Sequence, residues 1–333
     1  MQHCGDVFLA KTLRTQKKTS MMKQLFLICL FIGSTVIAQN KRIAITIDDL
    51  PLQNGKYLSN ERNHQITDKF LEKIKSQNAP VIGFVNEDKL QVDGKNDDSK
   101  ISLLKKWLDA ELDLGNHTFA HKSANRVSVE EYKKDLLDGE RVIRKLVEDK
   151  GKKLIYFRHP YLQTGRSLEV KNEIEKFIAG NGYTIAPVTF DNAEWIFAGA
   201  YRNAVDSSKT EMMNRIGSEY IDYMKRKLDY WESQSIALFG RNINHILLIH
   251  ANTLNADYYN ILCEIIRSSG YSFISLDEAL RDDAFKSKDT FIGAGGISWI
   301  HRWAVTQGKK KEFFGDEPKT PAYIMEYAGV ASE

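Results

Sequence analysis

The sequence predicts an α/β fold, a barrel of seven strand–helix units followed by a loop-rich C-terminal extension over residues 284–333. Two observations predict it. Short apolar runs alternate with longer amphipathic stretches over residues 41–282, and consecutive parallel strands need such a crossover between them. Seven repeats of this unit have the size of a barrel, with an open doubly wound sheet as the alternative.

Seven short apolar runs are the expected strands, and amphipathic stretches between them are the expected helices. The strands cover 43–47, 81–85, 112–115, 154–157, 184–188, 245–249 and 272–274. The helices cover 61–77, 99–110, 128–150, 168–181, 209–233 and 256–269, with a last one beginning near Leu276. The clearest is 209–233, where large apolar residues recur at spacings of three and four.

Residues 284–333 break the alternation. Gly293, Gly295, Gly296, Pro318 and Pro321 predict a segment with much irregular backbone. A cluster of large side chains in it indicates that the segment packs on the barrel or borders a groove. The cluster comprises Trp299, His301 and Trp303.

The N-terminal residues 1–38 read as an extension plus a signal peptide. Lys23 precedes an apolar run over 25–37, and small residues follow, so we expect cleavage after Ala38. The run is too short to favour a spanning helix, although an uncleaved membrane anchor is the alternative. The mature protein is then expected to be exported, to a periplasm or out of the cell, with no stable membrane insertion.

Composition excludes several classes of protein. The chain has 47 Lys and Arg against 44 Asp and Glu, a formal net charge of +3, which gives no reason to expect nucleic acid as a partner. Its cysteines are Cys4, Cys29 and Cys263, too few for a disulfide framework or a cysteine-based zinc site.

Unusual polar residues follow five of the expected strands. Because the carboxyl ends of all barrel strands meet on one face, where active sites of such folds are built, these stretches are expected to converge. They are Asp48-Asp49, Asn116-His117 with His121, Arg158 with Tyr161, Asp191 with Glu194 and Trp195, and His250.

The spacing of His117 and His121 suggests a metal site. On a helical turn, residues four apart lie on one face, so both imidazoles can share an ion. Taken alone, the pair is also compatible with two ordinary histidines. A carboxylate from the Asp48-Asp49 pair completes a two-His, one-Asp set that leaves coordination positions open, as in catalytic zinc sites. The other carboxylate is then available as a base, because successive side chains on a strand point opposite ways.

The remaining strand-end residues have both structural and chemical interpretations. Arg158 can hold a carboxylate by a bidentate contact or form a structural ion pair. His250 can be a core histidine or a general acid, since its ordinary pKa lies near neutrality. Trp195 and Tyr161 can be core aromatics or the apolar wall of a sugar-sized pocket.

Together the five stretches resemble the polysaccharide deacetylase family (NodB homology, carbohydrate esterase family 4) over about residues 41–282. That family has a distorted (β/α)7 barrel, in agreement with the seven units. Two departures are Ile47, where Phe is more usual, and Glu194, where Asp is frequent. The matching motifs are Thr46-Ile47-Asp48-Asp49, His117-Thr118-Phe119-Ala120-His121, Arg158-His159-Pro160-Tyr161, Asp191-Asn192-Ala193-Glu194-Trp195 and Leu248-Ile249-His250.

The resemblance implies a division of labour among the residues. Asp48 matches the catalytic base, and Asp49, His117 and His121 match the metal ligands. His250 matches the acid. A two-His, one-Asp set suits Zn²⁺, and Co²⁺ or Ni²⁺ can also bind it.

Further residues match family positions that stabilise the transition state. Arg158 matches the residue that tethers the base, the backbone N–H of Tyr161 an oxyanion donor, and Asp191 the partner that tunes the acid. Two residues match the wall of the acetyl pocket, namely Trp195 and Leu248.

The function implied is metal-dependent removal of acetyl groups from a carbohydrate, by N-deacetylation of a glycan containing N-acetylglucosamine or by O-deacetylation of a polysaccharide. One alternative is a hydrolase of a cyclic amide, ureide or other non-peptide C–N bond on the same fold. The full set Asp49, His117 and His121 argues against it. Another alternative is a non-catalytic carbohydrate-binding relative, against which the intact acid and base argue.

Overall fold

The computed structural model describes residues 41–333; the predicted signal peptide lies outside this range. The main sheet is parallel and has the strand order β7-β6-β5-β2-β1-β8, with β9 paired to the first residues of β1. All seven predicted strands are therefore confirmed. The strands are β1 (Lys41–Leu50), β2 (Val81–Val85), β5 (Asp113–Asn116), β6 (Tyr156–Phe157), β7 (Thr184–Ile185), β8 (His245–His250) and β9 (Tyr271–Phe273).

The sheet curls into a distorted barrel rather than ending in two open edges. After β7 the chain continues to Phe190, which pairs with Leu247 of β8 at the opposite end of the strand order. The N–H groups of Thr189 and Phe190 both donate to the carbonyl of Ile246, at 3.1 and 3.0 Å. This closure is distorted because β6 and β7 have only two residues each. An antiparallel hairpin, β3 (Gln91–Val92) and β4 (Lys95–Asn96), stands apart from the sheet.

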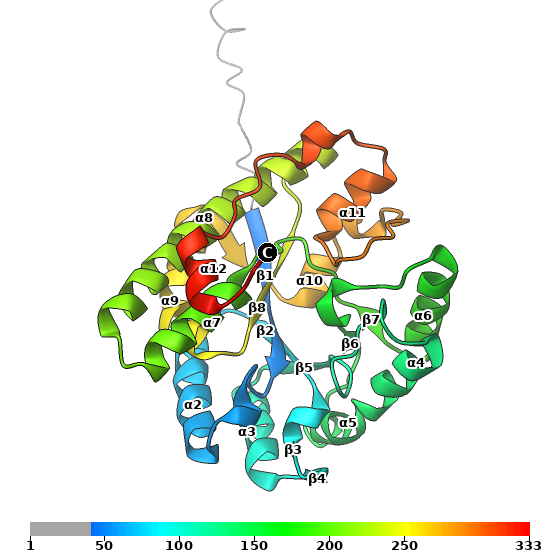
Figure 1. The fold of residues 1–333 in the computed structure, drawn as a ribbon. Helices are drawn as coiled ribbons and strands as arrows, with labels where there is room; N and C mark the ends of the chain where they lie inside the picture. The colour runs from blue at the N-terminus through cyan, green and yellow to red at the C-terminus, as the bar shows by residue number, and fades with distance from the viewer. Residues whose placement is uncertain (1–40) are drawn as a thin grey trace, which may run out of the picture. The chain divides into compact units, whose positions relative to one another are not determined.

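Helices surround the strands in Figure 1. Their apolar faces pack against one face of the strands in a large core. A second, smaller apolar cluster lies on the other face of the sheet. The helices up to the last strand are α2 (Asn60–Gln77), α3 (Asp98–Asp109), α4 (Val129–Asp138), α5 (Arg141–Glu148), α6 (Leu168–Gly180), α7 (Glu194–Asp206), α8 (Thr210–Phe239) and α9 (Thr253–Ser268), and α10 (Leu276–Leu280) follows β9.

Two helices differ from the expectation. The predicted helix 128–150 is divided into α4 and α5 at Gly139, where a Cβ atom would lie 2.4 Å from the backbone carbon of Thr118. The close approach of that loop explains the break. The second difference is α7, which the periodicity did not predict, and which begins at Glu194 within a stretch notable in the sequence only for its polar residues.

The C-terminal segment 284–333 is loop-rich, as predicted, but carries two helices, α11 (Trp299–Thr306) and α12 (Ala322–Ala328). In Figure 1, α12 lies on α7 and α11 contacts α8. Trp303 and Ile324 are buried in the main core, which agrees with the expectation that this segment packs on the barrel.

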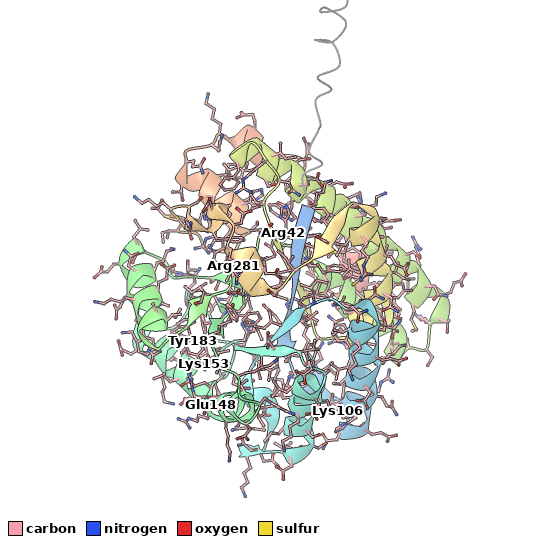
Figure 2. All side chains as sticks on the ribbon, turned by 180° about the vertical axis from the view of Figure 1, so that it is seen from behind. Arg42, Lys106, Glu148, Lys153, Tyr183 and Arg281 are labelled. Carbon is pink, nitrogen blue, oxygen red and sulfur yellow. The ribbon has the colours of Figure 1, made fainter. Side chains whose placement is uncertain are left out.

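The carboxyl ends of the parallel strands meet on one side of the barrel, and the polar motifs follow those ends. Figure 2 views the molecule from behind and labels residues at the opposite, amino ends, such as Arg42 in β1 and Tyr183 before β7. Among residues 41–333, no helix has the length and apolarity needed to cross a membrane.

Candidate active site

A bulge at the end of β1 places two neighbouring carboxylates on the same side. Ile47 pairs with Gly83 of β2, but Leu50 pairs with Val85, so β1 holds one extra residue in this interval. Asp49 takes up the irregularity with a left-handed φ of 69°. Asp48 Oδ2 and Asp49 Oδ1 then lie 3.6 and 3.9 Å from His117 Nε2. The expectation that neighbouring side chains diverge is therefore wrong here.

The two histidines are held by a loop rather than by the helical turn that their spacing suggested. Thr118 and His121 have left-handed φ values of 67° and 54°. The Asp135 carboxylate of α4 fixes this loop, since it accepts N–H bonds from Ala120 at 3.1 Å and Lys122 at 3.2 Å. The loop geometry brings the imidazoles of His117 and His121 together with their ring centroids 4.8 Å apart.

Asp49, His117 and His121 form a group that could hold a metal ion, with one ligand atom of each within 4.8 Å of the others. The His117 ring fits this role because its Nδ1 lies 2.9 Å from the carbonyl of Arg158, so Nδ1–H donates there and Nε2 is left as the ligand. Asp49 Oδ1 is buried and accepts no hydrogen bond within residues 41–333. The Lys89 ammonium, 3.0 Å away, is its charged neighbour in an ion pair.

The protonation states of this group suit metal binding. Burial lowers the pKa of His117 well below its ordinary value and also lowers the pKa of His121, so both rings are neutral near pH 7. Burial alone would raise the pKa of Asp49, but nearby positive charge, that of Lys89 above all, outweighs it and lowers this pKa. A deprotonated carboxylate and two neutral imidazoles are the forms that bind a cation.

Asp48 occupies a different electrostatic position from Asp49. Burial raises the pKa of its carboxyl to about 6, and the nearby Arg158 guanidinium opposes this rise. Arg158 is fully buried, with Nη1 3.8 Å from Asp48 Oδ2, and its Nη2 donates to Thr46 Oγ1 at 2.8 Å. A buried carboxylate that titrates near neutrality is suited to accept a proton.

The stretch after β6 forms a tight turn beside the histidine loop. Tyr161 and Leu162 both have left-handed φ values, 57° and 54°. The Tyr161 ring packs edge-on against His121, with centroids 4.4 Å apart, and is 55% exposed. Ten non-glycine residues among 41–333 have positive φ, and five of them lie in the three loops described so far, a concentration of strain typical of functional sites.

His250 ends β8 and is the strand neighbour of Asp48 in the pairing of β1 with β8. Its Nδ1 lies 2.7 Å from Glu194 Oε2. Burial would lower the pKa of His250, but the hydrogen bond and charge of Glu194 raise it to about 9. The imidazolium form therefore persists at neutral pH, which suits a proton donor.

Glu194 is fully buried at the start of α7 and is itself held firmly. Its Oε1 accepts hydrogen bonds from Asn252 Nδ2 at 2.6 Å and Asn255 Nδ2 at 2.8 Å. Asn255 also donates to the His250 carbonyl at 2.8 Å.

The other predicted site residues lie nearby with different contacts. Among residues 41–333 no hydrogen bond or ion pair joins Asp191 to His250, so the carboxylate that contacts the histidine is Glu194 instead. Asp191 Oδ1 accepts the N–H of Asn192, and burial raises its pKa to about 6. Trp195 is 42% exposed at the start of α7, and Leu248 is buried in β8.

Sequence reasoning missed the contacts of four contributors. Glu194 is a departure from the motif in the sequence, yet it makes the contact expected of Asp191. Asn252 and Asn255 lie outside the motifs, although Asn252 caps α9 and its spacing to Asn255 is a visible signal. Lys89 gives no sequence signal, because its approach to Asp49 depends on the turn after β2.

Comparison with known families finds one match, and comparison with solved structures finds distant relatives. Residues 36–178 match the family model of polysaccharide deacetylase. A comparison with curated proteins finds no match.

Three of the solved structures illustrate the identity, coverage and TM-score of these matches. The peptidoglycan deacetylase of Bacillus subtilis is 19% identical, with 72% of this chain and 92% of that chain covered and a TM-score of 0.45. A family 4 carbohydrate esterase from Streptomyces lividans, in complex with acetate, is 16% identical, with 72% and 96% covered and a TM-score of 0.42. A mutant of a CE4 family pseudoenzyme from Bacillus anthracis, with restored enzymatic activity, is 16% identical, with 73% and 68% covered and a TM-score of 0.46.

The family model covers four strands of the main sheet and the first three motifs, up to the loop after β6. The resemblance predicted from the motifs is thus confirmed over residues 36–178, which match the polysaccharide deacetylase family model.

Proposed function

We propose that this protein is a metal-dependent hydrolase that removes acetyl groups from a carbohydrate. One observation carries the proposal. A group that could hold a metal ion, formed by Asp49, His117 and His121, lies beside the buried carboxylate of Asp48. The neighbour of Asp48 on the adjacent strand is His250, which is a charged imidazolium at neutral pH. A proton acceptor and a proton donor beside a metal site are the equipment of hydrolytic acyl transfer.

Asp49, His117 and His121 would hold the ion, with Zn²⁺ the best match and Co²⁺ or Ni²⁺ as alternatives. When bound there, such an ion supplies Lewis acidity that polarises an acetyl carbonyl and acidifies a water molecule. The other steps belong to the chain's own side chains.

Asp48 accepts the proton of the attacking water, and Arg158 keeps the carboxylate oriented. The N–H of Tyr161 donates to the acetyl carbonyl oxygen, which becomes negative as the water oxygen bonds to the carbonyl carbon and before the C–N or C–O bond breaks. A donor of this kind is worth roughly 3 kcal/mol of the barrier. His250, held by Glu194, then protonates the departing amine or alkoxide, so that acetate and the free sugar group leave. Trp195 and Leu248 are proposed to wall the acetyl pocket, and Asp191 is proposed to tune the acid alongside Glu194.

The proposal extends to the organisation and location of the protein. Residues 41–282 would form the catalytic domain, 284–333 an extension of it, and 1–38 an N-terminal extension with a cleaved signal peptide that directs export. The apolar run 25–37 and the following Ala38 support export. The expected partner is an acetylated glycan or oligosaccharide, with no nucleic acid.

The test is acetate release by the purified protein, loaded in turn with Zn²⁺, Co²⁺ and Ni²⁺. Substrates would be N-acetylglucosamine oligomers, peptidoglycan and acetylated xylan, with a cyclic ureide as the competing class. We expect release from at least one glycan, its loss on chelation and its return with metal. Turnover of the ureide alone, or sugar binding with no acetate release, would overturn the proposal.

A further inference from the structure

The C-terminal segment reaches back to the loop that carries Tyr161, and this contact lies outside the residues matched by the motifs. Residues 289–302 contact this loop through a buried arginine, several backbone carbonyls and a glycine. The role inferred for this contact rests on the proposed function, in which the Tyr161 N–H stabilises a developing negative charge.

Arg302 of α11 is the centre of the contact and is fully buried. Its Nη1 donates to the carbonyl of Leu162 at 3.2 Å, and its Nη2 donates to Thr164 Oγ1 at 2.7 Å. Its Nε donates to Asp289 Oδ2 at 2.9 Å. A guanidinium has the rigid fork of donors needed to join three such acceptors at once, which an ammonium lacks.

Asp289 neutralises this buried charge and is anchored in turn. Lys171 of α6 donates to the Asp289 carbonyl at 3.1 Å and lies 3.5 Å from Asp289 Oδ2. The Arg302–Asp289 pair is therefore fixed to the barrel wall on one side and to the Tyr161 loop on the other. Burying an ion pair without functional need is rarely stabilising compared with apolar packing.

A second set of contacts joins the same segments through the backbone. Gln163 Nε2 donates to the carbonyl of Ala294 at 3.0 Å. Asn125 Nδ2 donates to the carbonyls of Gly293 and Ala294, at 2.9 and 3.1 Å, while its Oδ1 accepts the N–H of Gly165 at 3.0 Å.

Gly296 completes the contact by its lack of a side chain. A Cβ atom at this position would lie 1.9 Å from the carbonyl oxygen of Tyr161 and 2.6 Å from Leu162 Cβ. Only glycine allows the two backbones to approach so closely.

The loop needs such support because two consecutive residues, Tyr161 and Leu162, hold left-handed φ values. Such a conformation is unfavourable for any residue with a side chain. Within the loop itself, the bonds from Leu162 N–H to the His159 carbonyl and from Gln163 N–H to the Pro160 carbonyl offset part of this strain. Arg302 and Gly296 act on the peptide groups that directly follow Tyr161.

We propose that residues 289–302 set the direction of the Tyr161 N–H and that Arg302 is the positioning residue for this oxyanion donor. The C-terminal segment thereby serves catalysis, although it supplies no reacting group. Its loss acts on the transition state, not on metal or substrate binding.

The test is the Arg302→Lys variant of the full chain, which keeps the positive charge but loses the planar array of guanidinium donors. We expect kcat to fall by roughly 100-fold, the scale of a displacement of about 1 Å in a site, with KM and metal content unchanged. Arg241→Lys is the matched control. Arg241 is likewise paired with an aspartate, Asp282, but at the amino end of β8. The control should keep kcat, with a smaller loss of melting temperature than Arg302→Lys because the Arg241 side chain is 40% exposed.

Gly296→Ala gives an independent reading, and it decides the matter if Arg302→Lys does not fold. It should lower kcat in the same way by displacing the Tyr161 peptide. Suppose that the wild-type protein releases acetate and that both folded variants keep its kcat, or differ from it only by a higher KM or a lower metal content. The positioning role is then wrong while the proposed function stands. If wild-type protein releases no acetate from any glycan, both fail together.

Discussion

The carboxylates on the two sides of the candidate site differ in how their oxygen atoms are satisfied. Glu194 accepts hydrogen bonds from Asn252 and Asn255 and contacts His250, at 2.6, 2.8 and 2.7 Å. Asp48 and Asp49 are also buried, yet Oδ1 of each accepts no hydrogen bond within residues 41–333.

This difference distinguishes the carboxylates that are available to react from the carboxylate that supports a neighbouring side chain. A buried acceptor without a hydrogen bond destabilises a fold by about 1 to 3 kcal/mol, a cost that a bound ion or water would offset at Asp48 and that the Lys89 ammonium partly offsets at Asp49. Glu194 needs no such ligand and serves to orient and charge its histidine. The Asp48–Asp49 side is therefore where a cation and water are expected, and the Glu194 side is a preformed support.

The largest effects should follow loss of a ligand on the open side. Asp49→Ala or His117→Ala should remove the bound metal and reduce acetate release to the background of the uncatalysed reaction. Metal content by mass spectrometry and acetate release measure the two effects. His64→Ala, on α2 and outside the cluster, is the control and should keep both. Full metal content in Asp49→Ala would break the comparison.

The next effect isolates Asp48 from its neighbour. Asp48→Asn removes the proton acceptor but no ligand, so turnover should fall by about 100- to 10,000-fold while metal content stays at the wild-type value. Release rates and metal content measured on the same sample test this. Near-normal turnover would remove Asp48 from its role as base.

The open side is largely predictable from the sequence, because its residues come from local motifs at strand ends. The spacing of His117 and His121 points to those two ligands, the family resemblance of the motifs assigns Asp49 as the third, and the alternation of apolar runs predicts all seven strands. The sequence did not predict the local geometry of these residues correctly. The bulge that turns Asp48 and Asp49 to one side arises from the pairing of β1 with β2, which no single strand encodes.

The supporting side is harder to predict because it depends on tertiary contacts. Glu194 meets His250 across 56 positions of sequence, and Arg302 meets Leu162 across 140. Neither contact has a periodicity or a spacing that marks it. The motif resemblance assigns the partner of His250 to Asp191, and only the position of α7 shows that Glu194 is the neighbour.

A pH profile tests the preformed side. The pKa of His250 is raised to about 9, so the donor form persists through neutral pH and activity should decline as pH rises through about 9. Glu194→Gln removes the charge that opposes burial, which lowers the pKa and moves this decline to a lower pH. Activity near pH 7.5 should drop by about 10- to 100-fold, the usual loss for a residue that orients a working histidine. Glu194→Asp keeps the charge and should return the decline of activity most of the way to its wild-type pH. If the decline occurs at the same pH in Glu194→Gln as in wild type, this carboxylate does not raise the pKa of the histidine.

The smallest effect concerns stability of the metal-free protein. Burial raises the pKa of Asp48 from 3.8 to about 6. A carboxyl whose pKa is raised on folding contributes stability that is present below its unfolded pKa and lost as pH rises through the folded one. Wild-type protein should therefore lose stability between about pH 4 and pH 6 by an amount that Asp48→Asn does not.

Denaturant unfolding in the presence of a chelator measures this difference. The stability of Asp48→Asn relative to wild type should increase by roughly 2 to 3 kcal/mol from pH 4 to pH 7, since each pKa unit corresponds to ~1.4 kcal/mol. Glu194→Gln should instead be destabilised at neutral pH, because it breaks a network in which every carboxylate oxygen is bonded. A rise in the relative stability of Asp48→Asn from pH 4 to pH 7, together with a loss of stability in Glu194→Gln at neutral pH, is what distinguishes a site held open for a ligand from a support that the fold has already completed.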